Sequence, residues 1–545
     1  MKNLPRNRFG RRRLIQGAAA AGAGTAGLAL VGCGNDDDDD GVTPPPGDDD
    51  TSPGTDPTPG NGASQGGSVT MAISTVDSLD PQRGFLVVTR NLFYSIYDGL
   101  LAFDNELNVV PELATDWETP DGAVFTLNLR DGVTFHDGTP FNAEAVVANF
   151  DRLLDPATEA PDRDVFAGIV SYEAIDDLTV RFDMGVQNAD FLLNLTEKAG
   201  QMLSPTAIEE LGHDIGTQPV GAGPFKFEEW RQGDRVRLSR YEEYWDSGYP
   251  MLDEVVFVET EDPSVVSAAL RSGDVHIGLP APHDQDTMLD SGDFDLWEVG
   301  SVANVEDIIM FPFNSPMEDS RVRQAIVWAI NREAMNTVVH NGFHTIPHGI
   351  IPPASWAYNP AIEQEGFGYD PERARQLLEA AGFEDGLEFT NFVVNSPPRI
   401  LSAETMQAML AEVGITMRIE AIESSARVER QRQGDIQATN AGFSGRISMD
   451  QHMTLNYHSL GGFNYADYAP GPRDELIEQA RQSLDTEERA QLYRELEAHI
   501  VEDPAPRIPH LFRNNMYVVR NQVKQDGAAY RPDNMIRFKH VYREA

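Results

Sequence analysis

Hydrophobic and polar residues alternate in several segments of the chain, as they do in strands that are buried on one face. Residues 124–130 and 415–422 both follow this pattern. Residues 225–230 and 235–240 are joined by the turn residues Gln-Gly-Asp, which predicts a β-hairpin. The side chains expected to face inward are Phe125, Leu127, Leu129, Ile415, Met417, Ile419 and Ala421.

Other segments repeat hydrophobic residues every three or four positions, the pattern of an amphipathic helix. One such helix should begin at Ser320, whose hydroxyl can cap it. The residues Asp-Pro-Glu at 370–372 place a cap, a proline and an acid at the start of a second helix, and Gly382 ends it. A third helix is expected over residues 486–502. The residues predicted to be buried along these helices are Val322, Ala325, Ile326, Ala329, Ile330, Ala374, Leu377, Leu378, Ala381, Leu492, Leu496 and Ile500.

The mixture of strands and helices predicts an α/β fold with several sheets. The chain has 545 residues, which is too long for one hydrophobic core, because cores stop growing near ~250–300 residues. Hydrophobic residues make up 41% of the chain and charged residues 24%, as in folded globular proteins. Two or three lobes are therefore expected.

Residues 1–33 have the features of an export signal. Basic residues precede an alanine- and glycine-rich run that begins at Leu14 and is too short and too weakly hydrophobic to span a bilayer stably. Arg11 and Arg12 resemble a twin-arginine signal. Cys33, the single cysteine, follows Leu-Val-Gly and resembles the cysteine of a bacterial lipoprotein box, which would be acylated. The alternative is a chance cysteine near an ordinary cleavage site.

Residues 34–66 are expected to form a disordered tether. They are rich in aspartate, proline and glycine and hold hardly any apolar side chain, so they cannot bury enough surface to offset the entropy lost on ordering. The aspartates are not expected to bind calcium, because no fixed backbone holds their carboxylates in place. The tether would hold a folded body, residues 67–545, away from a membrane surface.

The charge balance excludes nucleic acid as a partner. The chain has 87 acidic and 42 basic residues, a formal net charge of −45, and phosphate backbones repel such a chain. The acidity could steer ligands, or it could keep the surface solvated in a saline habitat. Because acidic residues occur throughout the chain, we favour the second interpretation.

The sequence holds no recognisable catalytic or phosphate-binding motif. His136 lies beside a turn signal and has no nucleophile motif near it. The glycines of residues 221–224 precede a predicted strand, whereas a dinucleotide site needs a helix there. No enzymatic activity and no cofactor are therefore expected.

Three histidines, His340, His344 and His348, would share one face of an unbroken helix and could bind a transition metal. However, a glycine and a proline lie between them, and the helix should end near Asn341. We therefore expect a polar loop and not a metal site.

Six segments spread over the body have sequences typical of one known family. They are SLDP (78–81), YDGLLAFDNELNVVPELATDWE (97–118), FTLNLRDGVTFHDGTPFNAEAVV (125–147), PVGAGPFKFEEWRQGDRVRLSRYEEYW (219–245), SRVRQAIVWAINREAM (320–335) and YDPERARQLLEAAGF (369–383). In this order they resemble the large solute-binding proteins of ABC importers, the oligopeptide/dipeptide-binding family. The export signal and the lipoprotein box agree with that resemblance.

The resemblance implies a two-lobed periplasmic-binding-protein fold of the large, peptide-binding type. Solute would bind between open lobes, and the closed form would deliver it to a membrane permease and its ATPase. The protein would act as a monomer in the periplasm or on the outer face of the cytoplasmic membrane. The implied parts are a first lobe (67–100, 214–300 and 508–545), a subdomain inserted in that lobe (101–213) and a second lobe (301–507).

Peptides are the expected cargo, because an extended peptide can pair its backbone with strand edges in a cleft. Arg446 is the leading candidate to bind a solute carboxylate, since its guanidinium donates two parallel hydrogen bonds; the alternative is a surface salt bridge to one of the many acids. Relatives carry a similar Ser-Gly-Arg followed by Asp-Pro-Asp, where an acid could meet a peptide amine. Here Ser448 and Met449 replace the first two of those residues and Asp450 remains, which leaves amine recognition in doubt.

The surrounding segment is rich in aromatic residues, which suit a cleft wall because they cover area at low entropic cost. Ordinary core packing is the alternative. Asn314 matches a position near the interlobe crossing in the family and could hydrogen-bond a ligand backbone. The aromatic candidates are Phe443, Tyr457, Phe463, Tyr465 and Tyr468.

Other functions stay open at this stage. The same fold could carry a metal chelate, haem, a glycoside or an opine-like acid, because the chemistry of the cleft and not the fold decides the solute. An exported hydrolase is a second alternative, although the sequence shows no site for it. A chaperone-like role is a third and weaker one.

Overall fold

The structure is a computed structural model whose chain forms two units, residues 1–56 and 57–545. The residues it describes are 66–84, 89–104, 107–166, 168–299, 306–310, 316–443, 446–461, 469–504, 507–529 and 535–544. The predicted export signal, with Arg11, Arg12 and Cys33, and the tether up to residue 65 lie outside the described residues.

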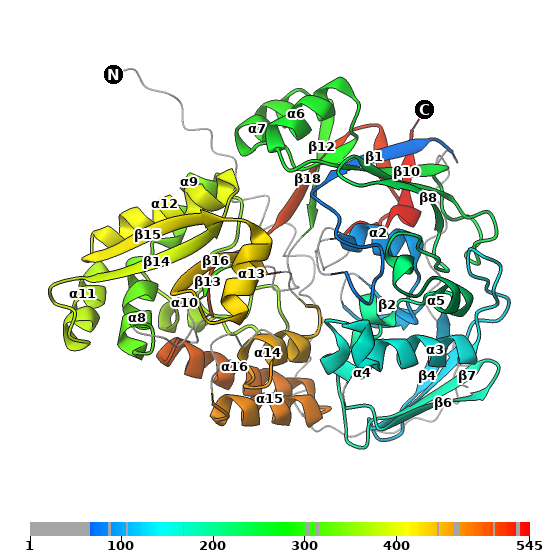
Figure 1. The fold of residues 1–545 in the computed structure, drawn as a ribbon, viewed down its shortest axis with the longest axis horizontal. Helices are drawn as coiled ribbons and strands as arrows, with labels where there is room; N and C mark the ends of the chain where they lie inside the picture. The colour runs from blue at the N-terminus through cyan, green and yellow to red at the C-terminus, as the bar shows by residue number, and fades with distance from the viewer. Residues whose placement is uncertain are drawn as a thin grey trace, which may run out of the picture. The chain divides into compact units, whose positions relative to one another are not determined.

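A seven-stranded sheet gathers segments from both ends of the body (Figure 1). Its order is β12-β18-β11-β1-β10-β9-β8, and β1 runs parallel to both of its neighbours, β10 and β11. The strands are β1 (Ser68–Ile73), β8 (Phe225–Arg231), β9 (Arg235–Arg240), β10 (Glu254–Glu259), β11 (Ile277–Gly278), β12 (Phe294–Val299) and β18 (Asn515–Arg520). Associated elements are α2 (Arg90–Ile96), α6 (Pro263–Ser272), α7 (Pro282–Asp290), the 3₁₀ helix η6 (Phe538–His540), and the pair β19 (Val523–Gln525) and β20 (Val541–Arg543). We call this part the seven-stranded region.

A four-stranded antiparallel sheet, in the order β4-β5-β7-β6, forms a separate core with helix α3. Its inner face is aromatic: Phe150 contacts Phe166 and Phe182 edge-on, and Phe191 packs against Phe125. The strands are β4 (Ala114–Glu118), β5 (Val124–Leu129), β6 (Ser171–Asp176) and β7 (Thr179–Asp183), with the pair β2 (Leu101–Phe103) and β3 (Val109–Pro111). The helices are α3 (Ala143–Leu154), α4 (Phe191–Asn194) and α5 (Pro205–Leu211), with 3₁₀ turns η2 (Pro156–Thr158), η3 (Arg163–Phe166), η4 (Lys198–Gly200) and η5 (Gly212–Gly216). We call this part the four-stranded region.

A five-stranded mixed sheet, in the order β15-β14-β16-β13-β17, carries the largest cluster of buried residues. Figure 1 shows α9 and α12 along this sheet, and α14, α15 and α16 as one group. The strands are β13 (Glu306–Met310), β14 (Leu387–Val394), β15 (Ile415–Ile422), β16 (Ala438–Phe443) and β17 (Arg507–Phe512). The helices are α8 (Ser320–Ala329), α9 (Arg332–His340), α10 (Ile362–Glu365), α11 (Pro371–Ala380), α12 (Pro397–Ala411), α13 (Ser424–Arg432), α14 (Met449–Tyr457), α15 (Pro472–Gln482) and α16 (Thr486–Glu502). We call this part the five-stranded region.

The chain passes twice between the seven-stranded and five-stranded sheets. It leaves β12 after Val299 and enters β13 at Glu306, and it returns from β17 to β18 between Phe512 and Asn515. Two such crossings are the topology that a hinge between two lobes requires. The residue boundaries of the lobes and of the inserted subdomain stay a prediction.

The locally encoded elements form where the sequence predicts them. Strand β5 buries alternate residues, β8 and β9 pair as the expected hairpin, and α16 has the predicted bounds. Helix α11 begins after Asp370, whose carboxylate accepts two backbone N–H bonds, and ends before Gly382, which has φ +85°.

Two local details differ from the prediction. The N-cap of α8 is Asp319, not Ser320, because Asp319 has the extended backbone and its carboxylate accepts the N–H of Arg321. Ala421 was expected to face inward but is exposed; it lies near the end of β15, the edge strand of its sheet, where the alternation of buried residues is lost. Four of the predicted core residues, Leu377, Ala381, Ile419 and Leu492, are only partly buried.

Candidate functional site

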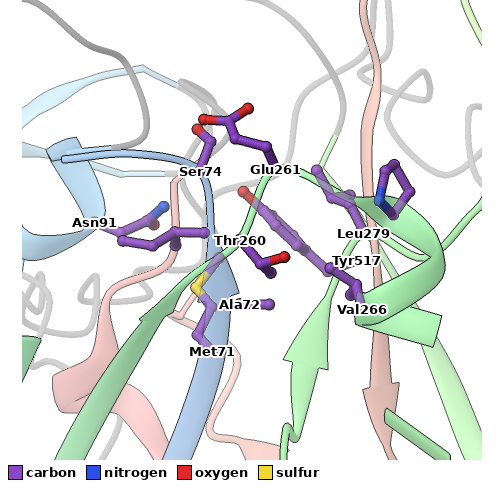
Figure 2. A pocket seen from close by; sticks show the side chains of 11 residues that line it. Met71, Ala72, Ser74, Asn91, Thr260, Glu261, Val266, Leu279 and Tyr517 are labelled. Carbon is purple, nitrogen blue, oxygen red and sulfur yellow. The ribbon is translucent and has the colours of Figure 1, made fainter. Parts of the chain in front are cut away.

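A pocket of about 180 Å³ opens in the seven-stranded region where β1 and β10 end (Figure 2). These strands run parallel, with Ile73 opposite Glu259, so their carboxyl ends meet at the pocket. Ligands of open α/β sheets bind at such carboxyl ends. The pocket is smaller than the ~300 Å³ that encloses a whole small molecule, so it fits one part of a larger site. Its lining is Met71, Ala72, Ile73, Ser74, Asn91, Thr260, Glu261, Pro263, Val266, Leu279 and Tyr517.

The polar groups of the pocket are fixed by contacts with their own surroundings. Glu261 is exposed, and its Oε1 accepts hydrogen bonds from the backbone and the hydroxyl of Thr75, each 3.0 Å long. Asn91 Oδ1 accepts the backbone N–H of Ile536 at 2.8 Å. Figure 2 shows the Tyr517 side chain between Glu261, on the polar side of the pocket, and the apolar residues on the other side. The site therefore combines one carboxylate with an apolar floor, which suits a solute that carries a positive group beside a hydrophobic one.

No residue of this pocket was predicted from the sequence. A signal was present, because Ser74 follows a hydrophobic strand directly and strand ends often carry ligand contacts. The alignment of β1 with β10 was not predictable, since their residues lie far apart in the sequence.

The predicted residue Arg446 lies at a contact between the five-stranded and four-stranded regions. Its guanidinium is buried and lies 3.5 Å from Asp162 Oδ1, and Lys198 Nζ lies 3.1 Å from the other oxygen of Asp162. Burial opposes ionisation of Asp162, but Lys198 and Arg446 together hold its pKa below the usual range. Arg446 therefore makes an ion pair within the chain, but the pair is buried and is not the surface salt bridge that was the alternative interpretation.

Ser448 and Asp450 lie at the start of α14, and both are buried. The Ser448 hydroxyl caps the helix by accepting the N–H of Gln451 at 3.0 Å. The Asp450 carboxylate accepts bonds of 3.0 and 3.1 Å from Arg481 Nε. Burial raises the pKa of Asp450, although Arg481 favours its ionised form. The structure thus brings Arg446, Ser448 and Asp450 together and pairs each of them with groups of the protein.

The aromatic candidates are only partly described. Tyr457 ends α14 and is fully buried in the core of the five-stranded region. Phe443 ends β16. The candidates that lie outside the described residues are Asn314, Phe463, Tyr465 and Tyr468.

The predicted polar loop at the three histidines agrees with the local structure. Helix α9 ends at His340, and Asn341 adopts the left-handed conformation with φ 53°. The rings of His340 and His344 lie 4.4 Å apart between centroids. In the described parts of the chain, no group of three or more histidine, cysteine or acidic side chains could hold a metal ion.

His136 holds a glycine turn in place. Its Nε2 lies 2.9 Å from the carbonyl oxygen of Gly223, and burial lowers its pKa to about 4. A Cβ on Gly221 would lie 2.2 Å from the carbonyl oxygen of Ile96. This turn needs its glycines because the backbone of α2 passes against it.

The sequence profile of bacterial extracellular solute-binding proteins, family 5 (middle), matches residues 108–465. The chain belongs to this family. It is 31% identical over 449 residues to the glutathione-binding protein GsiB of Shigella flexneri. The aligned residues cover 80% of this chain and 87% of that relative. Its solute-binding role in ABC import and its two-lobed α/β fold follow from this membership.

Two solved structures show the same fold. One is the ABC transporter-associated periplasmic binding protein DppA from Helicobacter pylori in complex with the peptide STSA, with 27% identity, a TM-score of 0.80, and 88% of this chain and 99% of that chain covered. The other is AgaA of A. tumefaciens R10 in complex with agropinic acid, with 25% identity, a TM-score of 0.78 and the same coverage. These relatives are binding proteins and not enzymes. No helix within the described residues has the length and apolar character needed to cross a bilayer.

Proposed function

We propose that this protein captures a short peptide or a peptide-derived solute outside the cytoplasm and delivers it, as a monomer, to an ABC permease and its ATPase. The observation that carries the proposal is the pocket of Figure 2, which lies at the carboxyl ends of two parallel strands, in a sheet linked to a second sheet by two crossings. A glutathione-binding relative and a neighbour with a bound peptide support this solute class.

Capture would use hinge bending at the two crossings. Solute binds to one lobe first. It shifts the equilibrium toward the closed form only by the factor by which it binds the closed form more tightly than the open form. We propose a first lobe of 67–100, 214–300 and 508–545, an inserted subdomain of 101–213 and a second lobe of 301–507. The residues proposed for the wall opposite the pocket, or for its support, are Arg446, Ser448, Asp450, Phe443, Asn314, Phe463 and Tyr457.

An opine-like acid is the second candidate solute, because the AgaA structure contains agropinic acid. Calorimetric titration of the purified protein with glutathione, the peptide STSA and agropinic acid separates the two classes. Binding of glutathione or STSA alone supports the proposal, and binding of agropinic acid alone contradicts it. Native mass spectrometry of protein purified without denaturation would identify a co-purified solute directly.

Glu261 is expected to bind the amine of the solute. Its exposed carboxylate is the acid of the pocket, whereas Asp450 is paired with Arg481. Glu261→Gln should weaken binding of a peptide with a free amino terminus about tenfold, because a hydrogen bond to a charged group contributes roughly 1.5–3 kcal/mol. Calorimetric titration with STSA measures this change.

Two controls make the Glu261 test specific. N-acetylated STSA should bind wild type and Glu261→Gln equally, since it has no ammonium group to lose a partner. Glu210→Gln, an exposed acid of α5, should leave binding of STSA unchanged. Equal affinity of free STSA for wild type and Glu261→Gln would place the amine elsewhere.

The lipid anchor is a separate proposal that depends on residues 1–33. We expect the twin-arginine signal with Arg11 and Arg12 to direct export, and Cys33 to be acylated, so that the protein stays on the outer face of the cytoplasmic membrane. Cys33→Ser should move the protein from the membrane fraction to the soluble fraction, as an immunoblot of fractionated cells would show. Unchanged membrane association would refute the anchor without affecting the solute proposal.

A further inference from the structure

Asp190 belongs to the four-stranded region but caps a helix of the five-stranded region. It stands at the start of α4, yet its side chain makes no capping bond to that helix. Instead, Asp190 Oδ2 accepts hydrogen bonds from the Ser448 hydroxyl at 2.9 Å and from the backbone N–H of Asp450 at 3.2 Å. Both donors lie in the first turn of α14 or at its cap.

The pocket around this carboxylate has the composition of an anion site. Arg489 of α16 donates to Asp190 Oδ1 at 2.5 Å. The Ser448 hydroxyl accepts from Gln451 while it donates to Asp190, so it links the N-terminus of α14 to the carboxylate. A helix N-terminus favours a negative charge, and a guanidinium strengthens the hydrogen bond. Asp190 is only 3% exposed, so these donors replace water almost completely.

Neighbouring contacts join the same two regions. The backbone N–H of Ile447 donates to Glu197 Oε1 at 3.0 Å, and the N–H of Ala189 donates to the carbonyl oxygen of Arg481 at 3.2 Å. The Ile447 side chain packs against Phe103. All of these contacts join the same two regions, so a separation of the regions would break them together.

We propose that Asp190 is a latch that holds the four-stranded region against α14 and thereby stabilises the closed form of the protein. The proposal rests on the hinge closure of the proposed function. The Asp190 carboxylate takes the place of an anionic ligand in a pocket built by the five-stranded region, and opening withdraws it. Ser448 suits this latch because its hydroxyl donates a hydrogen bond to Asp190. A second carboxylate at position 448 would repel Asp190.

Distances between spin labels test the latch directly. Labels attached through Asp131→Cys, in the turn after β5, and Glu379→Cys, on α11, report the separation of the two regions in the full-length chain carrying Cys33→Ser; both sites are exposed. The variants are Asp190→Asn and Ser448→Asp, with Asp177→Asn as the matched control, an exposed acid on the same region. Glutathione and STSA are the added solutes.

In protein without solute, Asp190→Asn and Ser448→Asp should shift the distance distribution to longer values and raise the open-to-closed ratio about tenfold, the effect of losing about one charge-assisted hydrogen bond. Asp177→Asn should not change the distribution. An unchanged distribution in both variants would overturn the latch. Ser448→Ala removes the hydroxyl bond to Asp190 and the cap bond from Gln451 but adds no charge. It should therefore give a smaller shift than Ser448→Asp, and it keeps the test valid if Asp190→Asn does not fold.

The outcomes separate the latch from the proposed function. If glutathione and STSA shorten the distance in wild type while Asp190→Asn behaves like wild type, solute closure stands and the latch is wrong. If the variants open the solute-free protein while neither solute shortens the distance in wild type or in the opened variants, the latch is supported and the proposed solute class is wrong.

Discussion

Replacing Lys539 with methionine is expected to lower the free energy of unfolding by about 3–5 kcal/mol at pH 8, the usual cost of leaving a buried charge without its partner. Lys539 is buried, and its Nζ lies 3.4 Å from Asp246 Oδ2. Three rings surround it, with centroids 5.6 Å away at Trp245 and 6.0 Å away at Tyr244 and Tyr249. Methionine keeps the apolar stem but removes the positive charge. Chemical denaturation measures the change.

The cost of Lys539→Met should be smaller at pH 5.5. Burial and the nearby Glu112 raise the pKa of Asp98 to about 7, while Lys539 lowers it. Asp98 is therefore largely protonated at pH 5.5 and needs the Lys539 charge less than it does at pH 8. Lys524→Met is the control, because the partly exposed pair of Lys524 and Asp295 should contribute less than about 1 kcal/mol. The prediction would be contradicted if, at pH 8, Lys539→Met lowered the free energy of unfolding no more than Lys524→Met does.

Glu497→Gln is expected to make the protein less sensitive to rising pH. Glu497 is buried in the core of the five-stranded region, and its Oε1 accepts the backbone N–H groups of Ile350 and Ile351 at 2.8 and 2.9 Å. Burial raises its pKa from 4.5 to about 7, although the two N–H bonds act in the opposite direction. Glutamine can accept both bonds through its own oxygen and carries no charge.

The sign of the effect follows from the raised pKa in the folded protein. The folded state favours protonated Glu497, so the stability from this group is fully present below pH 4.5 and is lost as the pH rises through about 7. The whole loss is about 3 kcal/mol, from about 1.36 kcal/mol for each pKa unit. The difference in unfolding free energy between Glu497→Gln and wild type, followed from pH 4.5 to 8, should therefore grow in favour of the variant.

The control for Glu497 is on the same helix. Glu495→Gln removes an exposed carboxylate of α16 and should give a difference from wild type that does not change with pH. The same slope for both variants would show that Glu497 does not titrate in the folded protein near pH 7. Charges elsewhere in this acidic chain cancel, because each comparison is made with wild type at the same pH.

The sequence predicts those elements whose signals are local. Asp370, Pro371 and Gly382 mark the ends of α11 because a cap, a fixed φ and a left-handed residue act within a few positions. Where local signals compete, the prediction is less exact. Asp319 and Ser320 are adjacent and both good caps, and the extended backbone of Asp319 decides between them.

No residue of the pocket at β1 and β10 was predicted, and the cluster at α14 was predictable only in part. The sequence points to residues 443–468, and the structure shows Arg446, Ser448 and Asp450 buried close together at α14. It could not identify their partners, because the chain has 87 acids and spacing does not show which of them approach. Asp190 lies 258 positions from Ser448, and the two meet only after both regions have folded.

By itself, the sequence determined the α/β class, the family, the acidic surface and the positions of those helices and strands whose local signals are strong, because periodicity, capping and motif order act along the chain. The tertiary structure alone decided three things: the pocket at β1 and β10, the pairing of Asp162 and Asp190 with Arg446 and Arg489, and the burial of Glu497 and Lys539. Each depends on groups that are distant in sequence and become buried against one another on folding. The free energy of a buried charge depends on these neighbours, so it cannot be read from the sequence.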